Sequence, residues 1–253
     1  MKAMLRWFAG VSALGLSAAV FAQSSAVVNP EYEALRDTLD SSLGGATRGQ
    51  LSVQRIRPSA MDGMLEVTLN SGEVLFTDPD GEFMLTGDLL RTNAQGFVNL
   101  SAETRKEQNI ARVAAVPDEE VITFSPDGDV RATISVFTDV DCTFCRRLHG
   151  DMDEILGHGI EVRYLAYPRG GTSAASYGKM LSVWCSDDRK RALTQAKNDQ
   201  NLPERNCDNP VLKHYELGNQ VGISGTPAII LQDGTVVPGY AGLDRLTSLV
   251  FGQ

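Results

Sequence analysis

The chain has 253 residues and a formal net charge of −9 at pH 7, with 23 lysines and arginines against 32 aspartates and glutamates. An acidic chain of this kind is not expected to bind nucleic acid. Hydrophobic residues make up 42% of the sequence, which is enough for a substantial core, and the length allows one or two domains. We predict two.

Residues 1–22 have the pattern of a secretory signal peptide. Lys2 and Arg6 give a positive start, an apolar stretch follows, and Ala22 ends a plausible cleavage site. A membrane anchor is the alternative, but the apolar stretch is shorter than the roughly 20 residues that a spanning helix needs. We therefore expect an exported protein with a charge of −11 once Lys2 and Arg6 are lost, in a compartment where disulfides persist.

Residues 23–100 are expected to form an α+β domain. Helical spacing over Glu31–Leu43 stops at Gly44-Gly45, and short strands should follow. The expected strands, separated by turn sequences, are Leu51–Ile56, Met64–Leu69, Val74–Thr77 and Glu82–Leu85. This part contains no cysteine and no histidine, so packing or association is its expected role.

Residues 101–117 are predicted to be a linker helix. Ser101 is the candidate N-cap, Glu103 lies in the first turn, and Pro117 stands just past the end. We expect the many charged residues of this helix to form a solvated face.

Residues 118–253 have the pattern of a thioredoxin-like α/β domain. Val121–Phe124 and Arg131–Phe137 flank a turn sequence and should pair as a hairpin. A helix is expected after Cys142, and Ile160–Tyr164 is the next strand. A strand, a helix and a parallel strand in this order are the core unit of such a domain.

Two cysteines separated by two residues, Cys142 and Cys145, stand where the apolar strand gives way to this helix. Free N–H groups and the helix dipole at a helix N-terminus favour a thiolate, the form of cysteine that attacks disulfides. Cys145, one turn later, can close a disulfide with Cys142 or displace a substrate held on it. We predict thiol–disulfide exchange, with half of a zinc site and a structural disulfide as alternatives.

The other cysteines, Cys185 and Cys207, bracket a mainly helical insertion within Thr172–Gly218. A disulfide across that loop would contribute roughly 3 kcal/mol in the chain-entropy view. Of the three possible pairings we expect Cys142 with Cys145 and Cys185 with Cys207, because the others would tie the redox turn to the insertion.

Near the end of the domain, Pro227 precedes the predicted strand Ala228–Leu231. Because few X-Pro bonds are cis, Pro227 taken alone is expected to be trans. A strand over Thr235–Val237 and a helix over Leu243–Phe251 complete the chain.

Several motifs in a fixed order give the chain a resemblance to the DsbC family, which comprises periplasmic thiol:disulfide interchange proteins of Gram-negative bacteria. They are Cys142-Thr143-Phe144-Cys145, Arg163–Arg169, Trp184-Cys185, Gly222–Ala228 and Val237–Tyr240, with Gly63-Met64, Asn70–Gly72 and Thr77-Asp78 upstream. The resemblance covers nearly the whole mature chain.

The resemblance implies a V-shaped homodimer in which residues 23–100 pair, the linker helices hold the arms apart, and the thioredoxin-like domains face an apolar cleft. It implies that Cys142 and Cys145 are catalytic, that Pro227 is cis, and that Cys185 and Cys207 form a structural disulfide. Thr143, Phe144, Thr226 and Pro227 would form the substrate-binding active-site loops. Neither a metal nor a cofactor is expected.

The activity implied is that of a disulfide isomerase with chaperone activity. The Cys142 thiolate would attack wrong disulfides in misfolded exported proteins, Cys145 would release stalled substrates, and a DsbD-type membrane reductant would restore the dithiol. The alternatives are a DsbG-like reductase of single oxidised cysteines and a module that mainly binds unfolded chains.

Charged neighbours of the motif are Arg146, Arg147 and His149. Each could favour a nearby thiolate, but we expect them at the solvated surface because spacing alone does not aim a side chain at sulfur. The position of thioredoxin's buried aspartate, six residues before the first cysteine, holds Val136. That acid is therefore not available as a proton acceptor.

Overall fold

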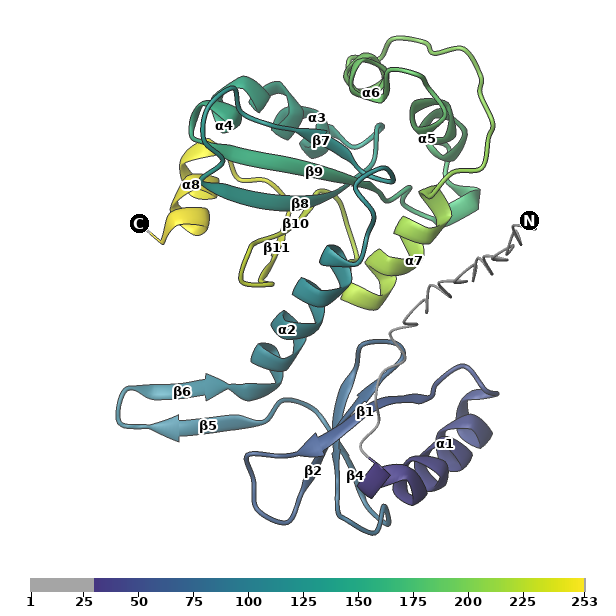
Figure 1. The fold of residues 1–253 in the computed structure, drawn as a ribbon, viewed down its shortest axis with the longest axis vertical. Coiled ribbons are helices and arrows are strands. Elements are labelled where there is room, and N and C mark those ends of the chain that lie inside the picture. The colour runs from purple at the N-terminus through teal and green to yellow at the C-terminus, as the bar shows by residue number, and fades with distance from the viewer. Residues whose placement is uncertain (1–29, 253) are drawn as a thin grey trace, which may run out of the picture.

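The computed structural model describes residues 30–252, so the predicted signal peptide at residues 1–22 lies outside the described part (Figure 1). An amino-terminal α+β part and a larger thioredoxin-like part are joined by one helix, α2. No helix within residues 30–252 is long and apolar enough to cross a membrane.

The amino-terminal part is a four-stranded antiparallel sheet covered by one helix. After a short 3-10 turn, η1 (Pro30–Tyr32), come α1 (Glu33–Thr47), β1 (Val53–Pro58), β2 (Leu65–Leu69), β3 (Val74–Thr77) and β4 (Met84–Thr86), with the strands in sequence order. Leu35, Leu39 and Leu43 recur every four residues on α1 and pack on Val67 and Leu69 of the sheet. Burial of this stripe is what holds the helix in place.

The prediction that α1 stops at Gly44-Gly45 is wrong. The helix continues to Thr47, and Arg48 then ends it in the left-handed region, with φ 55° and its N–H bonded to the Gly44 carbonyl. Glycine weakens a helix by only about 1 kcal/mol per residue. Packing of Leu43 on the sheet outweighs that cost.

A hairpin of β5 (Leu90–Asn93) and β6 (Gly96–Asn99) follows, and the sequence did not predict it. It forms a separate two-stranded sheet that extends away from the rest of the molecule (Figure 1). All four residues of β5 are exposed. The sequence therefore lacks the alternation of apolar and polar residues from which a strand is predicted.

The N-cap of helix α2 (Leu100–Ala114) lies two residues earlier in the chain than predicted. Asn99, not Ser101, is the N-cap, and its side-chain oxygen accepts a hydrogen bond from the Ala102 N–H at 2.9 Å. Ser101 instead accepts from the Leu89 N–H, which ties the hairpin to the helix.

The charged residues of α2 are all at least partly exposed, but three of its uncharged polar residues are buried. Thr104 donates to Glu66 at 3.0 Å, and Gln108 donates to Thr68 at 3.2 Å, both on β2. Asn109 donates to the Gly234 carbonyl of the thioredoxin-like part at 3.1 Å. The helix is therefore bonded to both parts of the chain through its polar residues.

The thioredoxin-like part is built on a five-stranded sheet in the order β11-β10-β8-β9-β7. Its strands are β7 (Ile122–Phe124), β8 (Ala132–Thr138), β9 (Ile160–Ala166), β10 (Ala228–Ile230) and β11 (Val236–Pro238). Only β8 and β9 are parallel, as the predicted strand-helix-strand unit requires. The predicted hairpin of β7 with β8 is wrong, because β7 pairs with β9 at the edge and leaves β8, buried at six of its seven residues, in the centre.

Helices cover both faces of this sheet. Ile134 and Val136 of β8 face a core shared with α3 (Thr143–Gly150), α4 (Met152–Gly157) and α8 (Leu243–Phe251). Phe137 faces the opposite core, which Leu165 and Ile223 share. The single helix expected after Cys142 is broken at Asp151, whose carboxylate accepts a hydrogen bond from the Tyr240 hydroxyl at 2.6 Å.

The insertion is helical for most of its length, as predicted. It contains η2 (Gly171–Ser173), α5 (Tyr177–Trp184), α6 (Arg189–Lys197) and α7 (Val211–Val221). A disulfide joins Cys185, at the end of α5, to Cys207 in the loop before α7.

Candidate active site

The strand β8 delivers the cysteine motif to the edge of the sheet. It ends at Thr138, a short turn follows, and Cys142 is the N-cap of α3, so the predicted position at a helix N-terminus is confirmed. The Cys142 carbonyl accepts the first helical bond from the Arg146 N–H at 3.0 Å. Cys142 and Cys145 are both free thiols, so the structure has the reduced form of this pair.

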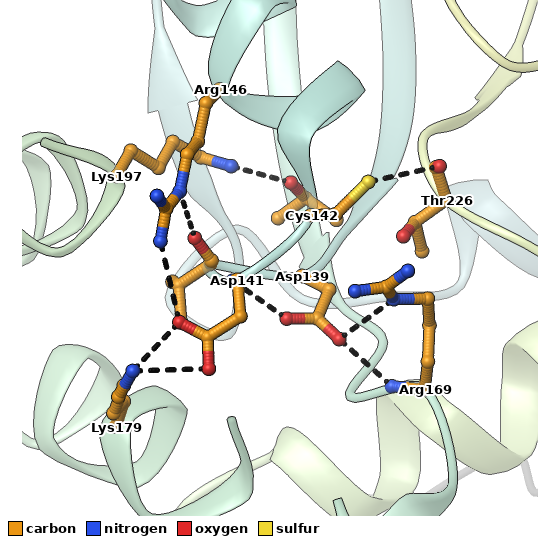
Figure 2. A network of polar contacts seen from close by, with 10 residues as sticks. Asp139, Asp141, Cys142, Arg146, Arg169, Lys179, Lys197 and Thr226 are labelled. Atoms are coloured by element: carbon orange, nitrogen blue, oxygen red, sulfur yellow. Dashed lines mark hydrogen bonds and ion pairs between the residues drawn. The ribbon is translucent and has the colours of Figure 1, made fainter. Parts of the chain in front are cut away.

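Thr226 lies directly against Cys142. It precedes β10, the strand hydrogen-bonded to β8, and the Cys142 sulfur lies 3.1 Å from its carbonyl oxygen, to which Cys142 donates a hydrogen bond while it is protonated (Figure 2). The bond between Thr226 and Pro227 is cis. The resemblance to the DsbC family implies this conformation, whereas the low general frequency of cis X-Pro bonds predicts a trans bond. The buried Thr226 hydroxyl has no hydrogen-bond partner within residues 30–252, so it is free to serve a thiolate.

The two sulfurs have opposite proton affinities. A hydrogen bond from the Cys145 thiol is the largest effect on Cys142; burial opposes it, while the Thr226 hydroxyl, the Cys145 N–H and the charge of Arg169 support it, and together they lower the pKa of Cys142 to about 5. Burial and the same bond raise the pKa of Cys145 far above its ordinary value. Near neutral pH, Cys142 is therefore the thiolate and Cys145 holds the proton.

A buried carboxylate organises the turn before Cys142. Asp139 is 2% exposed and accepts hydrogen bonds from the Asp141 N–H at 2.9 Å, the Arg169 N–H at 3.0 Å and Arg169 Nε at 3.2 Å (Figure 2). The Asp139 carboxylate thereby holds the Arg169 guanidinium on the side of the cysteine pair. This explains how a cation 24 positions beyond Cys145 contributes to the low pKa of Cys142.

Arg146 is held in a second set of polar contacts rather than standing free at the surface. Its Nε donates to the Val140 carbonyl at 2.9 Å, and it pairs with Asp141, which also accepts from Lys179 at 2.8 Å (Figure 2). The contacts brace the turn on the side away from Arg169.

His149 was predicted at the solvated surface, which is wrong. The ring is buried and contacts the Tyr164 hydroxyl at 3.2 Å and Thr194 Oγ1 at 2.9 Å. Burial first, and the charge of Lys197 second, lower the pKa of His149 to about 4, so the ring is neutral. Of the three charged neighbours, only Arg147 is exposed, as expected.

The predicted loop residues Thr143 and Phe144 are exposed on the first turn of α3, with Phe144 at 56%. An exposed aromatic ring beside a nucleophilic sulfur is an apolar contact available to an incoming chain. The structure thus brings five predicted site residues, Cys142, Cys145, Thr143, Phe144 and Thr226, into one place. Pro227 follows Thr226 directly.

Lys197 and Thr138 are site residues that the sequence analysis missed. Lys197 Nζ donates to Thr138 Oγ1 at 2.7 Å, beneath the cysteine pair. A signal was present: Lys197 lies four residues after Leu193, on the buried stripe of α6. A lysine in that position predicts a buried cation. Within residues 30–252 there is no group of three or more histidine, cysteine, aspartate or glutamate side chains arranged to hold a metal.

Comparison with known proteins assigns both parts of the chain. Residues 19–102 match the family described as the disulfide bond isomerase protein N-terminal domain, and residues 117–251 match the thioredoxin-like domain. The thiol:disulfide interchange protein DsbC of Salmonella typhimurium is 35% identical over 229 residues, which cover 90% of this chain and 89% of that protein. The chain belongs to the DsbC family of thiol:disulfide interchange proteins.

Other DsbC proteins are similar over most of their length. The DsbC protein of Escherichia coli K12 is 35% identical over 185 residues, 73% of this chain and 75% of that protein. Among solved structures, a disulfide interchange protein from Neisseria gonorrhoeae is 27% identical and covers 54% of this chain and 97% of its own, with a TM-score of 0.48.

Proposed function

We propose that this protein is a periplasmic disulfide isomerase that reshuffles wrong disulfides in misfolded exported proteins. One observation carries the proposal: at the start of α3 the Cys142 sulfur, with its pKa lowered to about 5, faces the Thr226 backbone while Cys145 keeps its proton. A thiolate at neutral pH beside a protonated partner is what an attacking and a resolving cysteine need.

The reaction begins when the Cys142 thiolate attacks one sulfur of a substrate disulfide. A mixed disulfide forms, and the other substrate sulfur leaves as a thiolate. That thiolate attacks another disulfide of the substrate and frees a different substrate thiolate. When a substrate thiolate attacks the substrate sulfur of the mixed disulfide, a new substrate disulfide forms and Cys142 leaves as a thiolate. The enzyme returns to its dithiol form with no net change in the number of thiols.

Cys145 provides the release of substrates that stall. Its sulfur attacks Cys142, which closes the Cys142–Cys145 disulfide and leaves the substrate reduced. The oxidised enzyme then needs an external reductant, for which we propose a DsbD-type membrane protein.

Substrate contact is proposed for the loops around Cys142. The exposed Phe144 ring and its neighbour Thr143 offer an apolar and a polar contact on α3. Thr226 and Pro227 offer backbone on the opposite side of the sulfur. An unfolded chain held between them would have its disulfide within reach of Cys142.

A homodimer is proposed through residues 23–100, with residues 101–117 as the linker helix and residues 118–253 as the catalytic domain. Two features support self-association. In the described sheet, β4 pairs only with β3 and so has one open edge. Phe83, Leu85 and Phe97, on and beside β4 and β6, expose 54–69% of their surface. Exposed aromatic residues beside an open strand edge mark an interaction surface.

The test is recovery of activity by a scrambled protein with several disulfides, incubated with the reduced mature protein while free thiols are counted. Recovery with little change in thiols is the expected result. Loss of substrate disulfides without recovery would instead indicate a reductase, and suppression of aggregation that survives Cys142→Ala would show a separate chaperone activity. Stoichiometric zinc in the reduced protein would favour a metal site.

A further inference from the structure

The helical insertion places a buried lysine under the cysteine pair. Lys197, the last residue of α6, is 2% exposed. Its one direct hydrogen bond within residues 30–252 goes to Thr138 Oγ1 at 2.7 Å, and its Nζ lies 5.4 Å from the centre of the Tyr164 ring. Lysine is rarely buried without a paired carboxylate, because removing its charge from water is costly. Its position therefore calls for a reason.

Thr138 connects this lysine to the resolving cysteine. The residue ends β8 and is fully buried, and its hydroxyl accepts a hydrogen bond from Lys197. The same hydroxyl neighbours the Cys145 sulfur, where it acts to lower the pKa of that thiol against the larger effect of burial. A hydroxyl both donates and accepts, so a proton can pass through it in either direction. Figure 2 shows Lys197 approaching from the opposite side of Cys142 to Thr226, so it does not occupy the side proposed for substrate.

The resolving step needs a proton acceptor. In the mixed disulfide Cys142 is bonded to substrate and no longer accepts from Cys145, but burial, the largest cause of the raised pKa of Cys145, remains. The thiol is therefore still protonated at neutral pH, and a thiol attacks a disulfide far more slowly than a thiolate. Val136 contributes no acid from β8. Lys197 is the buried base that the structure connects to Cys145.

The surroundings set the charge on Lys197. Desolvation lowers its pKa to about 8, against the opposing attraction of nearby negative groups. The titratable or charged groups that face it are Cys142, Cys145, Arg146 and His149 of α3, Asp139 of the turn and Tyr164 of β9. His149 is neutral, and burial holds the Tyr164 hydroxyl in its protonated form by raising its pKa.

We propose that Lys197 receives the proton of Cys145 through the Thr138 hydroxyl in the step that releases a stalled substrate. The inference rests on the thiol–disulfide exchange proposed above. Because Lys197 acts through Thr138, it is a positioning residue for the proton, while Cys145 makes and breaks the bonds.

The step balances as follows. With substrate bound to Cys142 through a mixed disulfide, the Cys145 thiol gives its proton to Thr138 Oγ1, whose own proton passes to the neutral Lys197 amine. The Cys145 sulfur attacks the Cys142 sulfur, the bond from Cys142 to the substrate breaks, and the electron pair leaves on the substrate as a thiolate. The two enzyme cysteines are oxidised, and the substrate disulfide is reduced. Lys197 later returns its proton to solvent.

The experiment uses the reduced full-length mature protein and an aromatic disulfide that releases thionitrobenzoate, followed by stopped-flow absorbance across a pH series. Attack by Cys142 releases the first thionitrobenzoate, and attack by Cys145 releases the second. In the unchanged protein we expect the second rate to rise with pH through about 8, where half of Lys197 is neutral, and to level off above that pH. The variant Lys197→Met keeps an unbranched side chain of similar length but has no amine. Its second release should be about 100-fold slower, and the pH profile of that rate should have no plateau.

Controls separate a proton relay from a structural role. Thr138→Val should reproduce the effect of Lys197→Met, and it stands in for that variant if the methionine protein does not fold. Lys190→Met changes a lysine of the same helix that lies over the Phe124 ring, and it should leave both releases unchanged. A first release that keeps its rate shows that the variants are folded and that Cys142 is intact.

A second release in Lys197→Met that keeps the rise through pH 8 and the plateau above it overturns the relay, while a structural defect would slow both releases without moving that rise. Absence of the first release in the unchanged protein would instead count against the proposed thiol–disulfide exchange itself.

Discussion

The Cys142 sulfur lies 3.1 Å from the carbonyl oxygen of Thr226, a residue 84 positions further along the chain. The contact exists because β8 and β10 are hydrogen-bonded neighbours, so the turn after β8 and the segment before β10 meet at one edge of the sheet. The sulfur is thus flanked by backbone that a bound chain can pair with and by a hydroxyl that supports the thiolate.

The Cys145 thiol should control the acidity of Cys142. Because its hydrogen bond is the largest cause of the low pKa, Cys145→Ala should raise the pKa of Cys142 from about 5 toward the ordinary range. In the unchanged protein, the rate of Cys142 alkylation should fall as the pH drops through about 5. Alkylation measured against pH for both proteins is the test, and equal midpoints would contradict it.

The same shift predicts a pH dependence of stability for the reduced protein. The folded-state pKa of Cys142 is depressed, so its stabilising contribution is fully present above the unfolded pKa of about 8.5 and is lost as the pH falls through about 5. Urea unfolding of the reduced protein and of Cys142→Ala at several pH values checks this. The stability difference between the two should shrink from pH 9 to pH 4.

Arg169 links the buried Asp139 to the cysteine pair. Arg169→Met removes the guanidinium that donates a hydrogen bond to Asp139, and with it the positive charge near Cys142. We expect a loss of about 2 kcal/mol of unfolding free energy, the size of a hydrogen bond to a charged group, together with a higher pKa of Cys142. Arg147→Met, at an exposed neighbour of the motif, should change neither quantity.

The disulfide of Cys185 with Cys207 should stabilise without taking part in exchange. It spans 22 residues, so replacing both cysteines by alanine should cost about 3 kcal/mol of unfolding free energy through the greater freedom of the unfolded chain. Thermal unfolding measures the cost. The rates of attack by Cys142 and Cys145 on a small disulfide should stay as they are, and a large loss of either rate would contradict this separation of roles.

Self-association should depend on the exposed aromatic residues Phe83, beside β4, and Phe97, on the hairpin strand β6. Phe83→Asp with Phe97→Asp places a charge at each of these two positions and should give a monomeric mass by light scattering. Exchange with a small disulfide should persist, while recovery of a scrambled protein should fall. Leu212→Asp, an exposed apolar position on α7, is the matched control and should leave the mass unchanged.

Much of the fold followed from periodicity. The helix stripe of Leu35 and Leu39, the parallel pair of β8 and β9, and the place of Cys142 at a helix N-terminus follow from the sequence, because each depends on local patterning. The pairing of β7 with β9 was not predicted. The partner of β7 depends on which strand lies in the centre of the sheet between the two cores, and local sequence does not specify this.

The site was predictable where the chemistry is local. The motif from Cys142 to Cys145 is itself a chemical pattern, whereas Lys197 and His149 are drawn to the site only by packing of α6 against α3 and β9. A lysine on an apolar stripe was a visible signal, but its partner Thr138 lies 59 positions away. Tertiary contacts over that distance are not encoded in spacing.

The most direct test of the account is to trap the exchange intermediate. Cys145→Ala cannot release a stalled substrate, so after incubation with a scrambled multi-disulfide protein it should accumulate a mixed disulfide. Mass spectrometry of peptides cut without reduction should map that bond to Cys142. Failure of Cys145→Ala to trap substrate, or a bond at Cys185 or Cys207 instead, would contradict Cys142 as the attacking thiolate.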